Sequence, residues 1–261
     1  MERKVVDFHA HAFADNIAEK AAQNLNTYYD IPLAGNGMFC HVKNSMIENK
    51  IDKLVVHATA TKASQVEHIN DYVKSLTNEN IIGFGTIHFE YENIKEEIDR
   101  IIKMGLRGMK FHPVFQGFNI DDKCMYPIYE CLEGRLPVLM HVGDKNVDMA
   151  TPSRLAKVMD DFPKLTVIAA HLGGVFEWDN AEKYLLGRDN LYVDTSSAIR
   201  FLTPERAAEL IKKQGTDRVL FGTDYPLSLH KYELDVLDKI PLTEEEKEQI
   251  LWKNAYKLLD L

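Results

Sequence analysis

Histidine and aspartate residues stand at the ends of apolar runs, at spacings suited to metal binding. His9 and His11 close the first run, and side chains two residues apart on a strand point to the same side. Single ionisable residues end three further runs: His141, His171 and Asp224. Burial of apolar residues does not require this placement, so the pattern indicates one polar site built from separate segments of the chain.

These residue types suit a borderline-soft divalent ion, which binds neutral imidazole nitrogens and a carboxylate and leaves a position for water. Such an ion acts as a Lewis acid and lowers the pKa of its bound water to about 7. A neighbouring carboxylate or imidazole is then needed to accept and return the proton. The residue types therefore predict a metal centre in a catalytic site.

Eight short runs rich in β-branched residues are expected to be buried strands. They cover residues 4–8, 53–57, 81–87, 107–111, 136–141, 166–171, 191–195 and 218–222. Amphipathic stretches with helical spacing lie between or after them, at 62–77, 93–104, 152–162, 203–214 and 243–259. Alternation of strand and helix predicts a parallel sheet with helical crossovers, and eight repeats predict an α/β (β/α)8 TIM barrel in a single domain over 1–261.

In such a barrel the carboxyl ends of the strands form the catalytic face, so the ionisable residues named above would converge there. A doubly wound open sheet is the alternative fold, but no glycine-rich phosphate turn follows the first run. The stretch 13–39 is expected to be irregular, and it follows the first strand, where barrels carry functional loops.

Three motifs and a single histidine carry a family resemblance. They are Asp7-Phe8-His9-Ala10-His11, Ala170-His171-Leu172-Gly173-Gly174, Gly222-Thr223-Asp224-Tyr225-Pro226 and His141. In order and spacing they resemble the amidohydrolase superfamily. More narrowly, they resemble its amidohydrolase-related branch, which includes aminocarboxymuconate-semialdehyde decarboxylase, resorcylate-type decarboxylases and lactone hydrolases.

The resemblance implies a barrel with one catalytic divalent metal, usually zinc (Zn²⁺). The metal ligands that it implies are His9, His11, His141 and Asp224. It also implies that His171 handles protons and polarises the substrate, or else binds a second metal. A homodimer is a further expectation from the resemblance.

A lysine in the fourth run opens an alternative with two metals. Lys110 and His112 lie on one face of that run. In binuclear members of the superfamily a carboxylated lysine at this place bridges two ions, and Lys110 would then share the second ion with His141 and His171. Otherwise Lys110 pairs with a carboxylate or holds an anionic substrate. The remaining motifs favour the single-metal arrangement.

Three further residues are weaker candidates for the pocket. His57 ends the second run, Asp194 lies near the end of the seventh, and Arg200 follows it. An arginine can bind a substrate carboxylate through two parallel hydrogen bonds. The alternatives are a core histidine for His57, a helix cap for Asp194 and a solvated residue at a helix entry for Arg200.

Two reactions suit the predicted site. The first is metal-dependent hydrolysis of an amide, ester or lactone in a small molecule, with Asp224 as the proton acceptor and His171 polarising the carbonyl. The alternative is metal-dependent decarboxylation of a small unsaturated or aromatic carboxylic acid. A metal-binding or scaffold protein without catalysis is a third class.

Composition narrows the classes of partner that the protein is expected to bind. Apolar residues make up 45% and charged residues 27%, close to the average for soluble domains. The balance of 31 Lys and Arg against 40 Asp and Glu leaves a net charge of −9, which argues against nucleic-acid binding. Cys40, Cys124 and Cys131 are too scattered for a disulfide framework. With no signal peptide and no apolar run of the ~18 residues that span a bilayer, we expect a cytoplasmic protein without a membrane partner.

Overall fold

The computed structural model describes residues 3–261, and all eight predicted strands are present. They are β1 Val6–His11, β2 Lys53–His57, β3 Ile81–Phe84, β4 Met109–Phe111, β5 Val138–Met140, β6 Val167–Ala169, β7 Leu191–Asp194 and β8 Val219–Leu220. Several strands are shorter than predicted. As a result, His141, His171 and Asp224 stand in the turns just beyond β5, β6 and β8.

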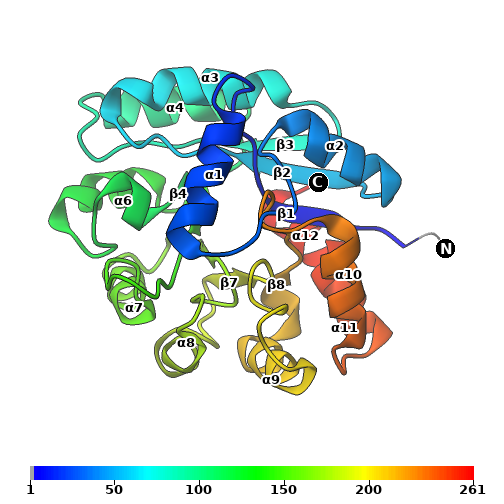
Figure 1. Ribbon diagram of the computed structural model, residues 1–261. Coiled ribbons are helices and arrows are strands. Elements are labelled where there is room, and N and C mark those ends of the chain that lie inside the picture. The colour runs from blue at the N-terminus through cyan, green and yellow to red at the C-terminus, as the bar shows by residue number, and fades with distance from the viewer. Residues whose placement is uncertain (1–2) are drawn as a thin grey trace.

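The strands form a parallel barrel. β1, β2 and β3 pair in one group and β4 to β8 in a second, and every pairing is parallel. Two parallel bridges join the groups, Gly85 to Met109 on one side and Ala10 to Tyr225 on the other. Helices surround this ring (Figure 1). The predicted (β/α)8 barrel is confirmed, and the open-sheet alternative is wrong.

Helices follow or flank the strands. They are α1 Ala18–Tyr29, α2 Phe39–Glu48, α3 Val66–Leu76, α4 Ile94–Met104, α5 Pro113–Gln116, α6 Tyr126–Leu132, α7 Pro152–Asp161, α8 Trp178–Tyr184, α9 Pro204–Gln214, α10 His230–Lys239, α11 Glu244–Glu248 and α12 Asn254–Leu259. A π-helical segment, Gln249–Lys253, joins α11 to α12, so the predicted helix over 243–259 is continuous but irregular. Within residues 3–261, no helix combines the length and apolar character needed to cross a membrane.

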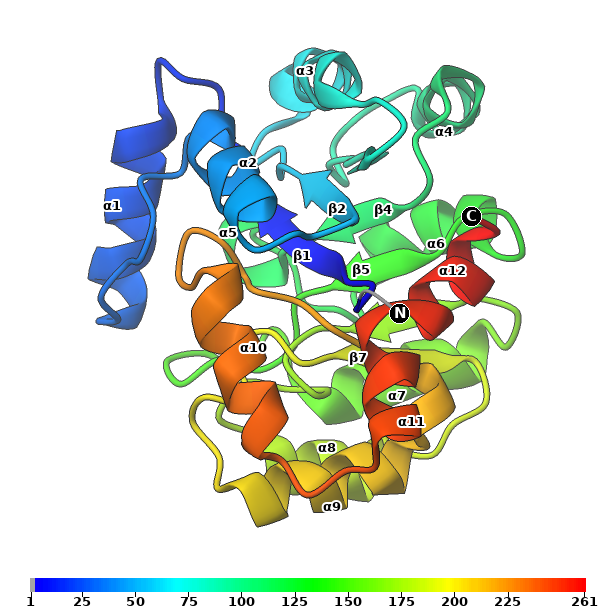
Figure 2. The ribbon, with the colours of Figure 1, turned by 90° about the vertical axis from the view of Figure 1, so that its right-hand side faces the viewer.

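The stretch 13–39 is only partly irregular, because the helix α1, Ala18–Tyr29, occupies its middle. The buried residues of α1 are Ala18, Ala22, Leu25 and Tyr29, which recur every three or four positions and form one apolar stripe. The stripe is narrow and polar residues fill the rest of the helix, which explains why the sequence hid it. The helix lies across the carboxyl ends of the strands, in front of the barrel in Figure 1 and at its left edge in Figure 2.

The interior of the barrel has an apolar layer next to α12 and a polar layer nearer the carboxyl ends of the strands. A buried cluster that includes Phe8, Phe84, Leu139 and Ile168 packs against Ala255 and other residues of α12. On β2, β4 and β7, alternation of side chains brings the buried polar residues His57, Lys110 and Asp194 to the interior. The apolar layers close the barrel floor, and the polar layer is available for chemistry.

Candidate metal centre and active site

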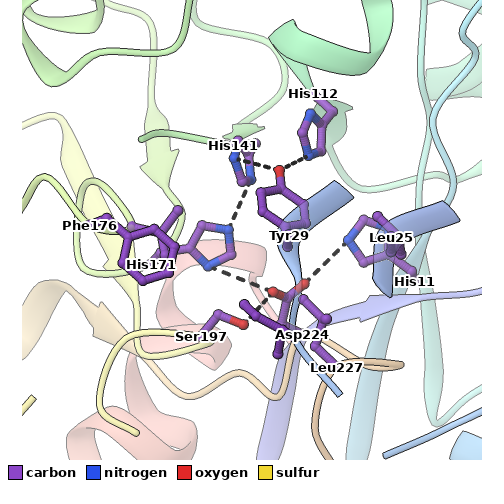
Figure 3. A pocket seen from close by; sticks show the side chains of 12 residues that line it. His11, Leu25, Tyr29, His112, His141, His171, Phe176, Ser197, Asp224 and Leu227 are labelled. Atoms are coloured by element: carbon purple, nitrogen blue, oxygen red, sulfur yellow. Dashed lines mark hydrogen bonds and ion pairs between the residues drawn. The ribbon is translucent and has the colours of Figure 1, made fainter. Parts of the chain in front are cut away.

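The five residues predicted from strand ends meet in one buried site. The Oδ1 atom of Asp224 lies 3.4 Å from Nε2 of His9 and 3.4 Å from Nε2 of His11. His171 places Nδ1 4.0 Å from the other oxygen of Asp224 and Nε2 3.0 Å from Nδ1 of His141 (Figure 3). These side chains come from β1 and from the segments that follow β5, β6 and β8, so the barrel itself assembles the site.

A β-bulge in β1 orients its two histidines. The register of β1 against β2 shifts between Asp7 and Ala10, so that one extra residue is accommodated there. A bulge of this kind re-aims a side chain beside an active site. Phe8 packs in the apolar cluster of the interior, and the next residue, His9, also points inward and reaches the site. Two consecutive inward side chains depart from the usual alternation along a strand, as expected at a bulge.

The carboxylate of Asp7 fastens β1 to the segment that carries Asp224. Its Oδ1 accepts hydrogen bonds from the backbone N–H of His9 and of Thr223, both at 3.0 Å. Its Oδ2 accepts the Thr223 hydroxyl at 2.6 Å. Because Asp7 is fully buried, these charge-assisted bonds set the separation between His9 and Asp224.

Hydrogen-bond partners determine which imidazole nitrogens carry protons. Nδ1 of His9 lies 2.8 Å from Asp194 Oδ2, Nδ1 of His171 lies 2.8 Å from the Ser196 carbonyl, and Nε2 of His141 lies 2.9 Å from the Gly143 carbonyl. Carbonyl and carboxylate oxygens only accept, so these three nitrogens donate. The opposite nitrogen of each neutral ring therefore offers a bare lone pair, the state in which histidine binds a metal.

The donors fit a divalent ion. Two lone pairs, on Nδ1 of His141 and Nε2 of His171, face each other at 3.0 Å and require a cation or a shared proton between them. Ligands bound to one ion at about 2.1 Å lie about 3.0–3.5 Å apart, and Oδ1 of Asp224 has this separation from Nε2 of His9 and from Nε2 of His11. Burial lowers the pKa of His11 to about 4 and holds that of His141 well below its usual range, so both rings are neutral at pH 7.

His57 lies beside the two histidines of β1. Its ring centroid is 4.9 Å from that of His9 and 4.5 Å from that of His11, and neither of its nitrogens has a hydrogen-bond partner within residues 3–261. Donor atoms of His9, His11 and His57 all lie within 4.8 Å of one another, as do those of His9, His171 and Asp194. The structure thus brings His57 into the site, where its ring nitrogens are available to bind a metal.

Lys110 and His112 also reach the site. The Lys110 ammonium lies 3.1 Å from Nε2 of His9, and burial lowers the pKa of this lysine to about 8. His112 stacks on His141 with ring centroids 3.9 Å apart. These positions suit either a second ion or a single ion with Lys110 beside it, so the number of metals stays a prediction.

Arg200 does not join them. Its guanidinium lies over the rings of Phe201 and Tyr232, at 5.2 Å from each centroid, and donates to the Leu227 carbonyl. Leu227 lines the pocket, whereas Arg200 bonds to its backbone carbonyl and is not a lining residue. Arg200 is therefore separated from the space where a substrate carboxylate would lie.

Residues that sequence analysis missed complete the site. The Tyr29 hydroxyl of α1 lies 3.2 Å from Nε2 of His112 and 3.3 Å from Nε2 of His141 (Figure 3). The Ser197 hydroxyl donates to Asp224 at 2.5 Å. Asp194, one of the weaker candidates from the sequence, accepts a hydrogen bond from Nδ1 of His9, the ring nitrogen that does not face Asp224. The signal for Tyr29 was its place in the apolar stripe of α1, but nothing local pointed to its target.

The pocket beneath α1 is small, with a volume of about 20 Å³. Apolar side chains form much of its wall: Leu25, Ile31, Val175, Phe176 and Leu227. A cavity needs roughly 10–15 Å³ to hold one water molecule, so this one admits only a group of a few atoms.

A buried glutamate on α10 gives a stability prediction. Burial raises the pKa of Glu233 to about 8, and neither carboxylate oxygen has a hydrogen-bond partner within residues 3–261. A raised pKa in the folded state means that protonation stabilises the fold, and this stabilisation is lost as pH rises from about 4.3 through 8. Glu233→Gln should therefore lose less thermal stability than wild type between pH 5 and pH 8.5.

The measurement is the unfolding midpoint at both pH values. Glu205→Gln is a matched control, because Glu205 also lies in the first turn of a helix but is exposed. An equal decline with pH in wild type and Glu233→Gln would contradict the prediction.

Comparison with known proteins places the chain in a family. The family described as Amidohydrolase matches residues 6–261. The 2-amino-3-carboxymuconate-6-semialdehyde decarboxylase of Dictyostelium discoideum is 26% identical over 243 residues, covering 75% of this chain and 66% of the relative. The enzyme of the same name from Caenorhabditis elegans is 22% identical over 233 residues, covering 64% and 58%. The matched part is under two thirds of both relatives.

A solved structure agrees in fold. The 5-carboxyvanillate decarboxylase of Novosphingobium aromaticivorans, solved with manganese and 4-hydroxy-3-methoxy-5-nitrobenzoic acid, has a TM-score of 0.76 at 16% identity. The likeness covers 100% of this chain and 97% of that one. The family match over residues 6–261 confirms the resemblance carried by the strand-end motifs: this chain belongs to the amidohydrolase family.

Proposed function

We propose that the protein is a metal-dependent decarboxylase of a small unsaturated or aromatic carboxylic acid. The observation that carries this proposal is that the matching relatives from Dictyostelium and Caenorhabditis are named decarboxylases. Hydrolysis of an amide, ester or lactone was the first expectation from the residues, and decarboxylation was its alternative. The relatives favour the alternative.

His9, His11, His141 and Asp224 would hold the ion, with His57, Lys110 and His171 beside it. A bound divalent cation would supply positive charge that orients the substrate and stabilises negative charge as it develops. Zinc is the expectation from the resemblance, whereas the structural neighbour contained manganese. Elemental analysis of the purified protein separates these two metals.

Decarboxylation breaks the bond between the carboxyl carbon and its neighbour. The electron pair stays on that neighbouring carbon, a proton takes the place of the carboxyl group, and carbon dioxide leaves. Asp224 and Nε2 of His171 are the groups positioned to hold and deliver this proton. Ser197 fixes the Asp224 carboxylate, and the Ser196 carbonyl fixes the His171 tautomer.

The apolar wall supports the same reaction. A carboxylate loses hydration when it enters the pocket, whereas the transition state spreads its charge over a conjugated system and depends less on water. The Tyr29 phenol stays protonated, because burial raises its pKa, and so it can donate a hydrogen bond to the substrate. The chain thus binds, orients and dehydrates the reacting group.

The test is product analysis on the metal-loaded protein. A panel of small aromatic and unsaturated acids should include one that releases one carbon dioxide per molecule consumed. Proton release from a lactone, ester or amide panel, without carbon dioxide, would instead support the hydrolase. Failure with both panels, with metal bound, would favour the non-catalytic class.

We further propose a small-molecule substrate, a cytoplasmic location and a homodimer, without a nucleic-acid or membrane partner. The acidic balance of 31 basic against 40 acidic residues supports the exclusion of nucleic acid. Sedimentation velocity at micromolar concentration should give about twice the monomer mass, and a monomer would contradict the dimer.

A further inference from the structure

A second chamber adjoins the small pocket. It has a volume of about 340 Å³ and shares His11, Leu25 and His112 with the small pocket. Ligand-binding cavities commonly have volumes of about 300–1,000 Å³. Because the small pocket has a volume of only about 20 Å³, the body of a substrate whose reacting group lies there must extend elsewhere.

The walls of the chamber carry no formal charge. Besides the three shared residues, its lining consists of Phe13, Ala21, Asn24, Thr59, Thr61 and Phe115. These are apolar or neutral polar side chains, and within residues 3–261 neither pocket is lined by a lysine or an arginine. Asn24 and Thr61 are exposed, so the chamber opens to solvent on their side.

Two polar atoms of the residues in this wall, Oγ1 of Thr59 and Nδ1 of His112, have no hydrogen-bond partner within residues 3–261. The Thr59 hydroxyl oxygen is buried and makes no hydrogen bond within residues 3–261. A buried hydroxyl that lacks a partner costs free energy, which a ligand hydroxyl, ether or carbonyl would recover. The chamber therefore suits a ring-sized apolar group with a neutral polar substituent.

Resting on the decarboxylase function proposed above, we infer that the substrate is a monocarboxylic acid whose uncharged, ring-sized body lies in this chamber. A second carboxylate on that body would lie against Phe13, Phe115 and Leu25, and the lining has no lysine or arginine to pair with it. Burying an unpaired charge is far more costly than burying a neutral group of the same size. The chamber thus selects against dicarboxylic acids.

Binding calorimetry on the metal-loaded protein tests this inference with two matched probes. They are 3-methylbenzoate and isophthalate, which differ by a methyl group against a second carboxylate on the same ring position. We expect 3-methylbenzoate to bind at least about tenfold more tightly. Equal or tighter binding of isophthalate, or no binding of 3-methylbenzoate, would overturn the inference.

Variants locate the binding site. Ala21→Leu narrows the chamber from α1 and should weaken 3-methylbenzoate binding by about tenfold. Gln23→Leu adds a leucine on the exposed face of the same helix and should leave binding unchanged. Equal binding by wild type and Ala21→Leu, with unchanged thermal stability and metal content, would place the ring elsewhere and contradict the inference.

A gain of function completes the test. Thr61→Lys puts a cation at the rim and should improve isophthalate binding relative to 3-methylbenzoate by about threefold to tenfold. No change in this ratio would count against the inference. Because these experiments measure binding, their outcome is independent of the carbon dioxide assay. Carbon dioxide release with a preference for dicarboxylic acids would leave the decarboxylase intact and reject only the selectivity.

Discussion

Asp224→Asn should lower kcat by more than the roughly 10²–10⁴-fold that loss of general acid–base catalysis alone produces. The substitution keeps the size of the side chain and removes its negative charge and its proton acceptor. Asp224 is predicted both to bind the metal and to carry the proton, so both functions are lost together. Its contacts with His9 and His11, each 3.4 Å from Oδ1, depend on the same charge.

The measurement combines kcat and KM on a confirmed substrate with metal content. Asp189→Asn is the control, because Asp189 is an exposed aspartate distant from the pocket lining. We expect the control to match wild type within about twofold, as surface substitutions usually do. An Asp224→Asn protein that keeps wild-type activity would show that the chemistry lies elsewhere in the barrel mouth.

The double variant His9→Ala/His11→Ala should lose its stoichiometric metal and its activity. Two neutral imidazole ligands disappear, and two ligands from elsewhere in the barrel cannot hold a divalent ion with comparable affinity. Elemental analysis after expression with metal available is the measurement. Wild type without a stoichiometric transition metal would refute the metal centre itself.

The exposed His68 provides the control, and His68→Ala should keep both metal and activity. The same analysis counts the ions. One ion per chain supports the arrangement with Lys110 as a neighbour of His9. If wild type carries two ions and His171→Asn carries one, the binuclear alternative with a carboxylated Lys110 is the better description.

Much of the fold could be predicted because its signals are local. Strands and amphipathic helices repeat along the chain, and each strand is recognisable within four to eight residues. The helix α1 escaped prediction because only four of its residues form the buried stripe. Its packing partner, the barrel mouth, exists only after the strands have closed.

The sequence by itself determined the fold class and the strand-end residues His9, His11, His141, His171 and Asp224, because a period of two and the end of an apolar run are properties of adjacent residues. Tertiary structure alone decided which partners those residues meet. Asp194 holds His9 across 185 positions of sequence, and Tyr29 reaches His141 across 112. It also joined Arg200 to the Leu227 carbonyl, outside the pocket lining, and it lined the adjoining chamber with uncharged side chains. Contacts between residues so far apart follow from how the ring closes and how its turns project, which no local pattern in the chain records.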